Sequence, residues 1–441
     1  MSTIDIKRVR ERLANERGPR FWRSLEELAD SGELSALLAD EFPRLEPLWE
    51  ASISRRNVLK LMAASMALAG LTACDRQPSE LIVPYVNMPE GMVPGEPKYY
   101  ATTHPVAGYA HGLLAETHEG RPTKVEGNPD HPATLGACDV YSQASVLSLY
   151  DPDRSSAVRW RGEVASYSRL LLELSDRQVT WDANGGRGLC LLTETLTSPS
   201  QYARLQSLLQ RWPEARWYSY EPVDRRAVFA GTELLFGEPL EPIYHFSRPR
   251  VIVSLDADFL ASMPGFLRYA HDCISQRRPR DGTTLSRLYV AEATPSITGA
   301  AADHRLRVTY QQIDALARQL ARKLGLDVAA PVQPVDEQWV SVVADDLKAN
   351  LGNALVVPGD QQPPAVHAIA QAINHHIGAY GGGVAAIEPV DYSHQAQPLD
   401  ALAAAMHASA VEALVVLGGN PVYTAPADLD FGRAYTRQPW T

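Results

Sequence analysis

The sequence predicts an α/β protein in which a small strand-rich N-terminal module precedes doubly wound, mostly parallel sheet domains. Short runs of consecutive apolar residues recur through the C-terminal part, as in Val251–Leu255, Ala354–Val357 and Ala413–Leu417. Such runs are typical of strands buried on both faces of a parallel sheet. Segments with helical periodicity, such as Phe266–Ser275, separate these runs, and this alternation is what a doubly wound sheet requires.

The length and composition limit the class of protein. A chain of 441 residues has room for two or three domains, and 45% hydrophobic with 21% charged residues is ordinary for a globular protein. The formal net charge of −11 argues against nucleic acid as a partner, because a polyanion would be repelled. The four cysteines are too few and too widely spaced for a disulfide scaffold or an all-cysteine metal site. They are Cys74, Cys138, Cys190 and Cys273, of which the last two are expected to pack as core residues.

Residues 1–50 are expected to form a helical leader. Apolar residues follow a helical spacing in Phe21–Ala29, Ser31 and Gly32 interrupt it, and Glu33–Phe42 resumes it. This leader would remain in the cytoplasm until export or be removed.

Residues 51–77 have the features of a twin-arginine (Tat) export signal. Arg55 and Arg56 lie in the motif Ser54–Lys60, and the apolar run Leu61–Ala73 that follows is too short to span a bilayer. The motif departs from the usual pattern at Val58, where such signals carry Phe, and it begins well inside the chain. The alternative is a buried helix with a basic start. A Tat signal predicts a protein exported in the folded state.

The apolar run ends in a sequence that resembles a lipobox, Leu71–Cys74. Acylation of Cys74 would anchor the mature protein stably to a membrane surface. The expected location is therefore the periplasmic, extracytoplasmic face of the cytoplasmic membrane. The alternative is an unmodified cysteine in a cleavage region.

Residues 78–98 are rich in Pro and Gly and are expected to be a linker. Residues 99–154 follow as the strand-rich module. Gly112–Thr117 and Thr123–Glu126 predict two strands joined by a turn at Glu119–Pro122. Tyr141–Tyr150 predicts a helix that ends before Asp151-Pro152.

Residues 155–441 are expected to form the α/β domains. Gly188–Leu192 and Leu288–Ala291 predict further strands, and Ser200–Leu209 predicts a helix. In such folds ligand-binding loops leave the carboxyl ends of the strands. The segments Leu255–Asp258 and Leu417–Pro421 occupy such positions.

The segment Glu119–Pro132 resembles the first domain of the molybdopterin oxidoreductases. Active members carry a C-x-x-C-x-x-x-C motif just upstream, which holds a four-iron cluster together with a fourth cysteine. The corresponding positions here are His104, Ala107, His111 and Cys138. The resemblance therefore implies that the cluster has been lost. Two alternatives are a metal site formed by the two histidines with the cysteine, and histidines that only pack or hydrogen bond.

Two further positions are suggested by the same resemblance. Gly418-Gly419-Asn420-Pro421 is similar to the loop that approaches the pterin nucleotide, although a tight turn needs the same residues. The molybdenum ligand of active members would fall near Ser219 and Asp224, and nothing in the sequence singles out either residue.

A narrower resemblance comes from Asp256–Leu260, Thr298–Arg305, Gln143–Leu147 and the displaced export signal. These segments resemble the large subunit of bacterial alternative complex III, with the similarity extending from Phe21 to about Phe431. That resemblance implies a subunit of a membrane-associated respiratory quinol:electron-acceptor oxidoreductase. The subunit would be a scaffold without cofactors, catalytic residues or metal ligands of its own.

The resemblance also implies partners, namely a ferredoxin-like iron–sulfur domain or subunit, multihaem cytochrome c subunits and a quinol-binding membrane subunit. The alternative is an active polysulfide- or nitrate-reductase-like enzyme with molybdopterin guanine dinucleotide, molybdenum and a 4Fe–4S cluster. Members of the family continue beyond Thr441, so a fragment, a truncated reading frame or a second polypeptide is expected. A partner would then cover an open sheet edge.

Overall fold

The computed structural model describes residues 91–93, 95–106, 108–278, 285–391 and 396–440. The described residues belong to one unit, Gly91–Thr441. The predicted leader, the export motif with Arg55 and Arg56, the lipobox with Cys74, and Ala107 lie outside the described residues. Within the described part of the chain, no helix has the length and apolar character needed to cross a membrane.

The N-terminal module is a three-stranded antiparallel sheet in the order β1-β2-β3. The predicted hairpin corresponds to β2 and β3, whereas β1 was missed because its residues are mostly exposed and form no apolar run. The predicted helix is shorter than expected and continues as a 3₁₀ turn. The elements are β1 (Lys98–Val106), β2 (Tyr109–His118), β3 (Arg121–Gly127), α6 (Val140–Ala144) and η1 (Ser145–Leu149).

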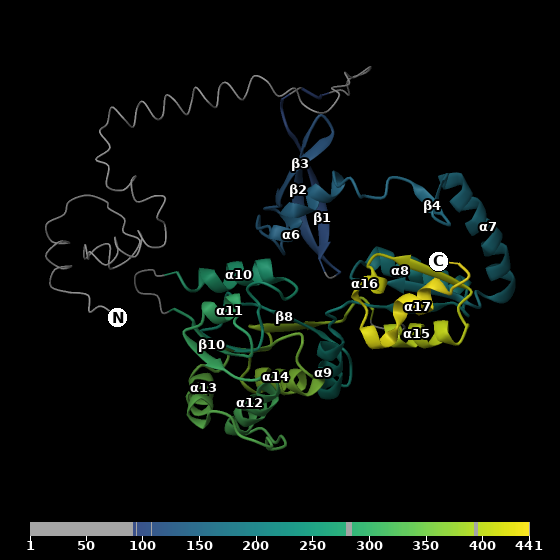
Figure 1. The fold of residues 1–441 in the computed structure, drawn as a ribbon. Helices are drawn as coiled ribbons and strands as arrows, with labels where there is room; N and C mark the ends of the chain where they lie inside the picture. The colour runs from purple at the N-terminus through teal and green to yellow at the C-terminus, as the bar shows by residue number, and fades with distance from the viewer. Residues whose placement is uncertain (1–90, 94, 107, 279–284, 392–395, 441) are drawn as a thin grey trace, which may run out of the picture. The chain divides into compact units, whose positions relative to one another are not determined.

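The larger parallel sheet has the strand order β11-β10-β9-β12. Val251 at the start of β9 pairs with Arg287 of β10 on one side and Ala354 of β12 on the other, so these three strands start in register. Helix α12 contacts both α13 and α14 (Figure 1). The elements are β9 (Val251–Leu255), β10 (Arg287–Glu292), β11 (His304–Arg307), β12 (Ala354–Pro358), α10 (Phe266–Ser275), α11 (Ile297–Ala300), α12 (Tyr310–Lys323), α13 (Glu337–Ala349) and α14 (Pro364–His376).

The second parallel sheet has the order β14-β6-β7 and joins segments from distant parts of the sequence. Alternate residues of β6 belong to two different hydrophobic clusters: Cys190 and Leu192 to one, Leu189 and Leu191 to the other. Because successive side chains of a strand point to opposite faces, this sheet is covered on both sides. The elements are α7 (Tyr167–Asn184), β6 (Leu189–Thr193), α8 (Pro199–Arg211), β7 (Arg216–Ser219), α15 (Leu399–His407), β14 (Ala413–Leu417), α16 (Pro421–Thr424), η2 (Ala427–Leu429) and α17 (Phe431–Thr436).

Two small antiparallel pairs complete the described elements. One pairs β8 with β13, and the other is the hairpin β4–β5. Helix α9 packs so closely on α14 that a Cβ atom at Gly231 would lie 2.4 Å from Cβ of His367. These elements are β4 (Val158–Trp160), β5 (Glu163–Ala165), α9 (Arg226–Phe236), β8 (Glu241–Tyr244) and β13 (Val384–Ile387).

The predicted fold class is confirmed: a small antiparallel module precedes α/β domains with parallel sheets. The prediction that Cys190 and Cys273 pack in the core is also confirmed, since both side chains are buried.

Candidate functional site

Two of the cluster-type positions of the N-terminal module, His104 and His111, lie around one hydrogen-bond network. His104 on β1 and His111 on β2 are directly opposite each other in the sheet register. Oγ of Ser142 lies 3.3 Å from Nδ1 of His104 and 3.4 Å from Nδ1 of His111. Oδ2 of Asp139 lies 2.7 Å from Nδ1 of His111 and accepts a hydrogen bond from the Ser142 hydroxyl at 3.1 Å. The network therefore ties both strands to the start of α6.

Asp139 has a second role as the N-cap of α6. Its Oδ1 atom accepts a hydrogen bond from the backbone N–H of Ser142 at 2.7 Å, which satisfies one of the free amides at the helix start. Burial disfavours the charged carboxylate, but the hydrogen bonds from Ser142 and the neighbouring His111 outweigh it and hold the pKa of Asp139 below its usual value. One side chain thus serves both the helix and the histidine.

Cys138 is half-buried beside this network, and its Sγ atom lies 3.6 Å from the backbone oxygen of Asp139. Burial, followed by the nearby Asp139 and Glu126 carboxylates, raises the pKa of the Cys138 thiol. The protonated thiol is a poor metal ligand, because the thiolate is the form that binds. Among the described residues, no three His, Cys, Asp or Glu side chains are grouped in a way that could hold a metal ion. In the structure His104 and His111 both take part in hydrogen bonds, which is what one of the predicted alternatives describes.

Replacing Asp139 by alanine tests the structural role of this network. The change removes the α6 cap and leaves His111 without its carboxylate, which together should lower the free energy of unfolding by about 2–4 kcal/mol. Asp139→Asn keeps a side-chain oxygen that can cap the helix, so it should lower the free energy of unfolding by less. Urea denaturation measures both, with the exposed Asp130→Ala of the same module as the control. An Asp139→Ala variant as stable as Asp130→Ala would contradict this role.

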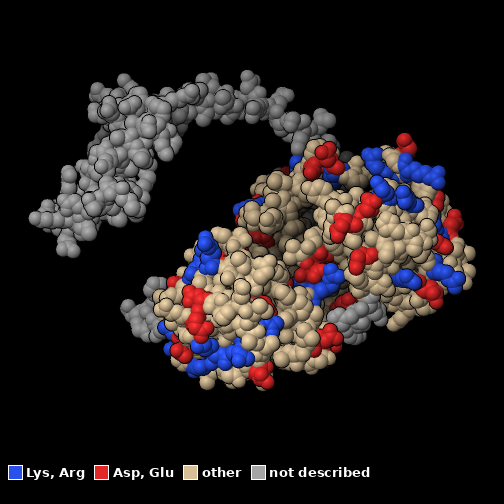
Figure 2. Space-filling view, turned by 60° about the horizontal axis from the view of Figure 1, so that its bottom comes forward, with Lys and Arg blue, Asp and Glu red and all other residues tan. Residues whose placement is uncertain are grey.

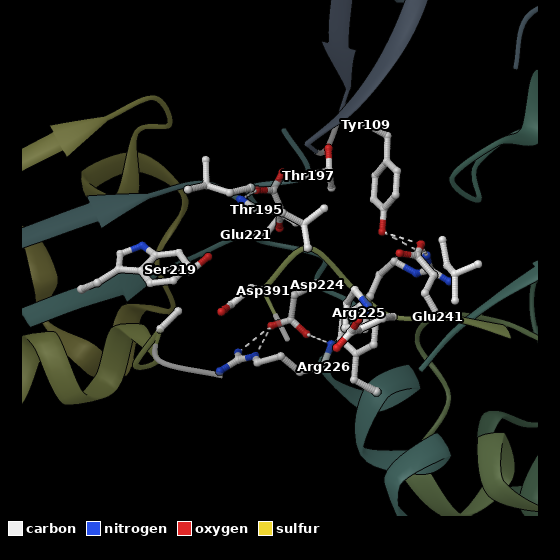
Figure 3. Close-up of a pocket in the computed structure, with 18 of the residues that line it drawn as sticks. Tyr109, Thr195, Thr197, Ser219, Glu221, Asp224, Arg225, Arg226, Glu241 and Asp391 are labelled. Atoms are coloured by element: carbon white, nitrogen blue, oxygen red, sulfur yellow. Dashed lines mark hydrogen bonds and ion pairs between the residues drawn. The ribbon is translucent and has the colours of Figure 1, made fainter. Parts of the chain in front are cut away.

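A separate pocket of about 540 Å³ lies at the carboxyl ends of β6 and β7. This is where ligands bind in open α/β sheets. Figure 3 shows Ser219, Glu221, Asp224, Arg226 and Asp391 around one part of the hollow, with Tyr109, Arg225 and Glu241 at the other. Its walls come from the start of β2, the segments after β6 and β7, helix α9, strand β8, and the stretch from β13 to α15.

Both residues predicted near the molybdenum position line this pocket, and both already have partners. The Ser219 hydroxyl donates a hydrogen bond to the backbone oxygen of Glu194 at 3.4 Å. Oδ2 of Asp224 accepts a hydrogen bond from Nε of Arg226 at 2.6 Å. The structure places the two residues in the same pocket without distinguishing either as a metal ligand.

Sequence reasoning missed a buried ion cluster at the edge of the pocket. Nη1 of Arg225 contacts Oε1 of Glu241, and Nε of Arg225 lies 3.4 Å from Oδ1 of Asp360. The Tyr109 hydroxyl donates to Oε1 of Glu241 at 2.9 Å and accepts from Arg225 at 3.0 Å. Burial raises the pKa of Tyr109, and it also raises the pKa of Asp360 despite the nearby Arg225. The cluster links β2 of the N-terminal module to β8, to the N-cap of α9 and to the loop after β12.

The pocket lining carries an excess of negative charge. Among the described lining residues there are five carboxylates and two guanidinium groups, which gives a formal charge of −3, and both guanidinium groups are ion-paired with carboxylates. Burial, and then the neighbouring Glu194 and Asp224, raise the pKa of Glu221, so a negative charge on the Glu221 carboxyl group is already unfavourable. Figure 2 shows acidic side chains gathered around a hollow on one face. The five carboxylates are Glu221, Asp224, Glu241, Glu388 and Asp391.

The loop that resembles a pterin-nucleotide loop has a local structural explanation. Gly418 and Gly419 have φ values of 82° and 69°, which are strained for other residues. The Asn420 side chain caps α16 by accepting a hydrogen bond from the Tyr423 amide at 3.3 Å, and Pro421 begins that helix. A Cβ atom at Gly418 would lie 2.7 Å from Oε2 of Glu194. The space over this loop is thus taken by an acidic side chain.

Two of the motifs behind the narrower resemblance contact each other. Oδ1 of Asp258 accepts hydrogen bonds from the amide and the hydroxyl of Thr298, at 3.0 and 2.7 Å. Oδ1 of Asp256, whose φ is 59°, accepts from the Ala293 amide at 2.9 Å. These residues hold the loops after β9 and β10 together.

Comparisons with known structures find distant similarities. The structure is similar to acetylene hydratase from Pelobacter acetylenicus with a TM-score of 0.43 and 13% sequence identity. The similarity covers 63% of this chain and 43% of the hydratase, so the matched part spans less than half the length of that enzyme. No protein-family model matches the sequence, and no curated protein sequence matches it.

Proposed function

We propose that this chain is a non-catalytic scaffold subunit of a membrane-associated respiratory quinol-oxidising complex of the alternative complex III type. The observation that carries the proposal is the charge of the pocket at the carboxyl ends of β6 and β7. In active molybdopterin oxidoreductases the corresponding crevice would hold a dinucleotide cofactor with negatively charged phosphates. Here the lining has a formal charge of −3, and repulsion between like charges in a part-buried site opposes such a cofactor.

The loop Gly418–Pro421 supports the same conclusion. Close backbone approach to a phosphate is the usual use of such glycines, because the exposed amides attract the anion. Oε2 of Glu194 lies where it would repel that anion. The residues present therefore do not fit a phosphate-bearing pterin cofactor.

The residues at the positions of the four-iron cluster do not fit that cluster either. A cubane cluster needs four donors, normally thiolates. Nδ1 of His111 is engaged by Asp139, Nδ1 of His104 lies beside Ser142, and Cys138 favours the protonated thiol. The hydrogen-bond network instead joins β1 and β2 to the segment that follows Cys138.

A catalytic enzyme is the second candidate, and the positions of Ser219 and Asp224 in the pocket favour it. Metal analysis of the purified full chain separates the two. We expect neither stoichiometric iron nor molybdenum, no cluster absorbance and no electron-spin signal after reduction. Four irons or one molybdenum per chain would overturn the scaffold proposal and leave the catalytic reductase.

In the proposed complex, electrons pass through neighbouring subunits and this chain fixes their spacing. The partners we propose are a cluster-bearing ferredoxin-like domain, multihaem cytochromes c and a quinol-binding membrane subunit. Export through the Tat pathway and acylation of Cys74 would place the chain at the periplasmic membrane face with them.

Replacing Arg55 and Arg56 together by lysine should leave the protein in the cytoplasm. The pathway reads the paired planar guanidinium groups, which lysine does not reproduce despite its equal charge. Cell fractionation followed by immunoblotting measures the effect, and the single Lys60→Arg variant of the same motif serves as the control. Unimpaired export of the double-lysine variant would refute the signal.

A further inference from the structure

The pocket at the ends of β6 and β7 combines apolar walls with an acidic lining. Trp217 and Phe229 contribute aromatic surface, and Ile243, Ile387 and Val390 contribute aliphatic surface. Its volume of about 540 Å³ lies within the range of small-molecule sites, roughly 300–1,000 Å³. An occupant can therefore bury an apolar body of moderate size.

The charged groups of the pocket determine which charge a ligand with an apolar body should carry. The cations on its lining are already matched, because Arg225 pairs with Glu241 and Asp360, and Arg226 pairs with Asp224. Glu221 and Glu388 add negative charge, and the part-buried Glu221 lies near Glu194 as well. An entering cation would relieve this repulsion, whereas an entering anion would increase it.

Aromatic rings and carboxylates together are the usual recognition elements for organic cations. A ring face attracts an ammonium or guanidinium group through its quadrupole, and a carboxylate accepts a charge-assisted hydrogen bond from it. Trp217 is held in place by a hydrogen bond from Nε1 to the Thr193 hydroxyl at 3.0 Å. Oε2 of Glu221 is held by the Thr195 amide at 3.3 Å. Both groups are thus positioned before any ligand arrives.

We propose that this pocket binds an ammonium or guanidinium group carried on an apolar body. The inference rests on the proposed function in one respect only, namely that no pterin cofactor occupies the crevice. The cation can belong to a free amine or to a Lys or Arg side chain of a partner subunit.

Calorimetric titration of the purified full chain tests the proposal with three probes of one shape. 2-Phenylethylamine should bind, 2-phenylethanol should bind at least about tenfold more weakly, and phenylacetate should bind least. Acetyl-Phe-Arg-amide distinguishes the sources: binding of the peptide supports a partner side chain, and binding of the amine without the peptide supports a free ligand. Equal binding of amine and alcohol, preference for phenylacetate, or no amine binding at millimolar concentration would overturn the proposal.

Variants assign the binding to the pocket. Glu221→Gln and the exposed Glu388→Gln should each weaken amine binding several-fold, and the second variant keeps the test usable if the first folds poorly. Glu163→Gln, on the exposed hairpin β4–β5, should leave the affinity unchanged. An unchanged affinity in both pocket variants would place the amine elsewhere and refute the site. The metal content measured for the proposed function is independent of this titration, so either can fail alone.

Discussion

Replacing Arg225 by methionine should lower the free energy of unfolding of the Gly91–Thr441 unit by about 3–5 kcal/mol, because it leaves two buried carboxylates without their cation. The Arg225, Glu241 and Asp360 side chains are only 10%, 11% and 13% exposed. Methionine keeps much of the side-chain volume, so the decrease in the free energy of unfolding comes from the lost charge and not from a cavity. Chemical denaturation at neutral pH measures it.

The neighbouring Arg226 provides a matched control. It is also ion-paired, with Asp224, but its side chain is 65% exposed. Solvent screens such a pair, so Arg226→Met should cost no more than about 1 kcal/mol. Adding Glu241→Gln to Arg225→Met should recover part of the lost stability, because one unpaired buried charge disappears. Equal losses for the two arginine variants would contradict a buried ion cluster at Arg225.

In the α/β domains, the strands that could be predicted from the sequence are those buried on both faces. β6, β9, β12 and β14 consist almost wholly of buried or part-buried apolar residues, so they are visible as uninterrupted runs. Their division between two sheets could not be predicted, since β6 pairs with β14 more than two hundred residues away. The periodicity of a sequence shows which face of a strand is buried, but it does not show with which other strand it pairs.

The same limit applies to the candidate site. The positions of His104 and His111 could be identified from a motif because their spacing survives in the sequence. Their partners Asp139 and Ser142 lie about thirty residues further on and were not predicted. Tyr109, Arg225, Glu241 and Asp360 are scattered over the chain and meet only in the folded protein. The one available signal was the paired Arg225 and Arg226 just beyond β7, where a doubly wound fold places its ligand loops.

A buried histidine behind the ion cluster makes the stability of this unit depend on pH. His367 on α14 is only 2% exposed, and neither ring nitrogen has a well-formed hydrogen bond within the described part of the chain. Burial, and then the nearby Arg225, lower the pKa of His367 to about 4, while the Asp360 and Gln362 backbone opposes the shift. An unfolded histidine titrates near about 6.5. Between these two values the unfolded chain binds a proton that the folded chain rejects.

The unit should therefore keep its full stability above about pH 6.5 and lose about 3 kcal/mol as the pH falls from there to 4, where the folded pKa is reached. Asp360 acts in the opposite direction, because burial raises its pKa and the folded state therefore takes up a proton there at a higher pH than the unfolded chain. His367→Leu removes the titrating ring and two unsatisfied nitrogens, so it should match or exceed the wild type in acid while changing little at pH 7.5. Urea denaturation at a series of pH values measures the difference between the two proteins. Parallel stability curves from pH 7.5 to 4.5 would show that His367 does not carry this dependence, whereas curves that diverge only below pH 6.5 would assign it to the buried imidazole.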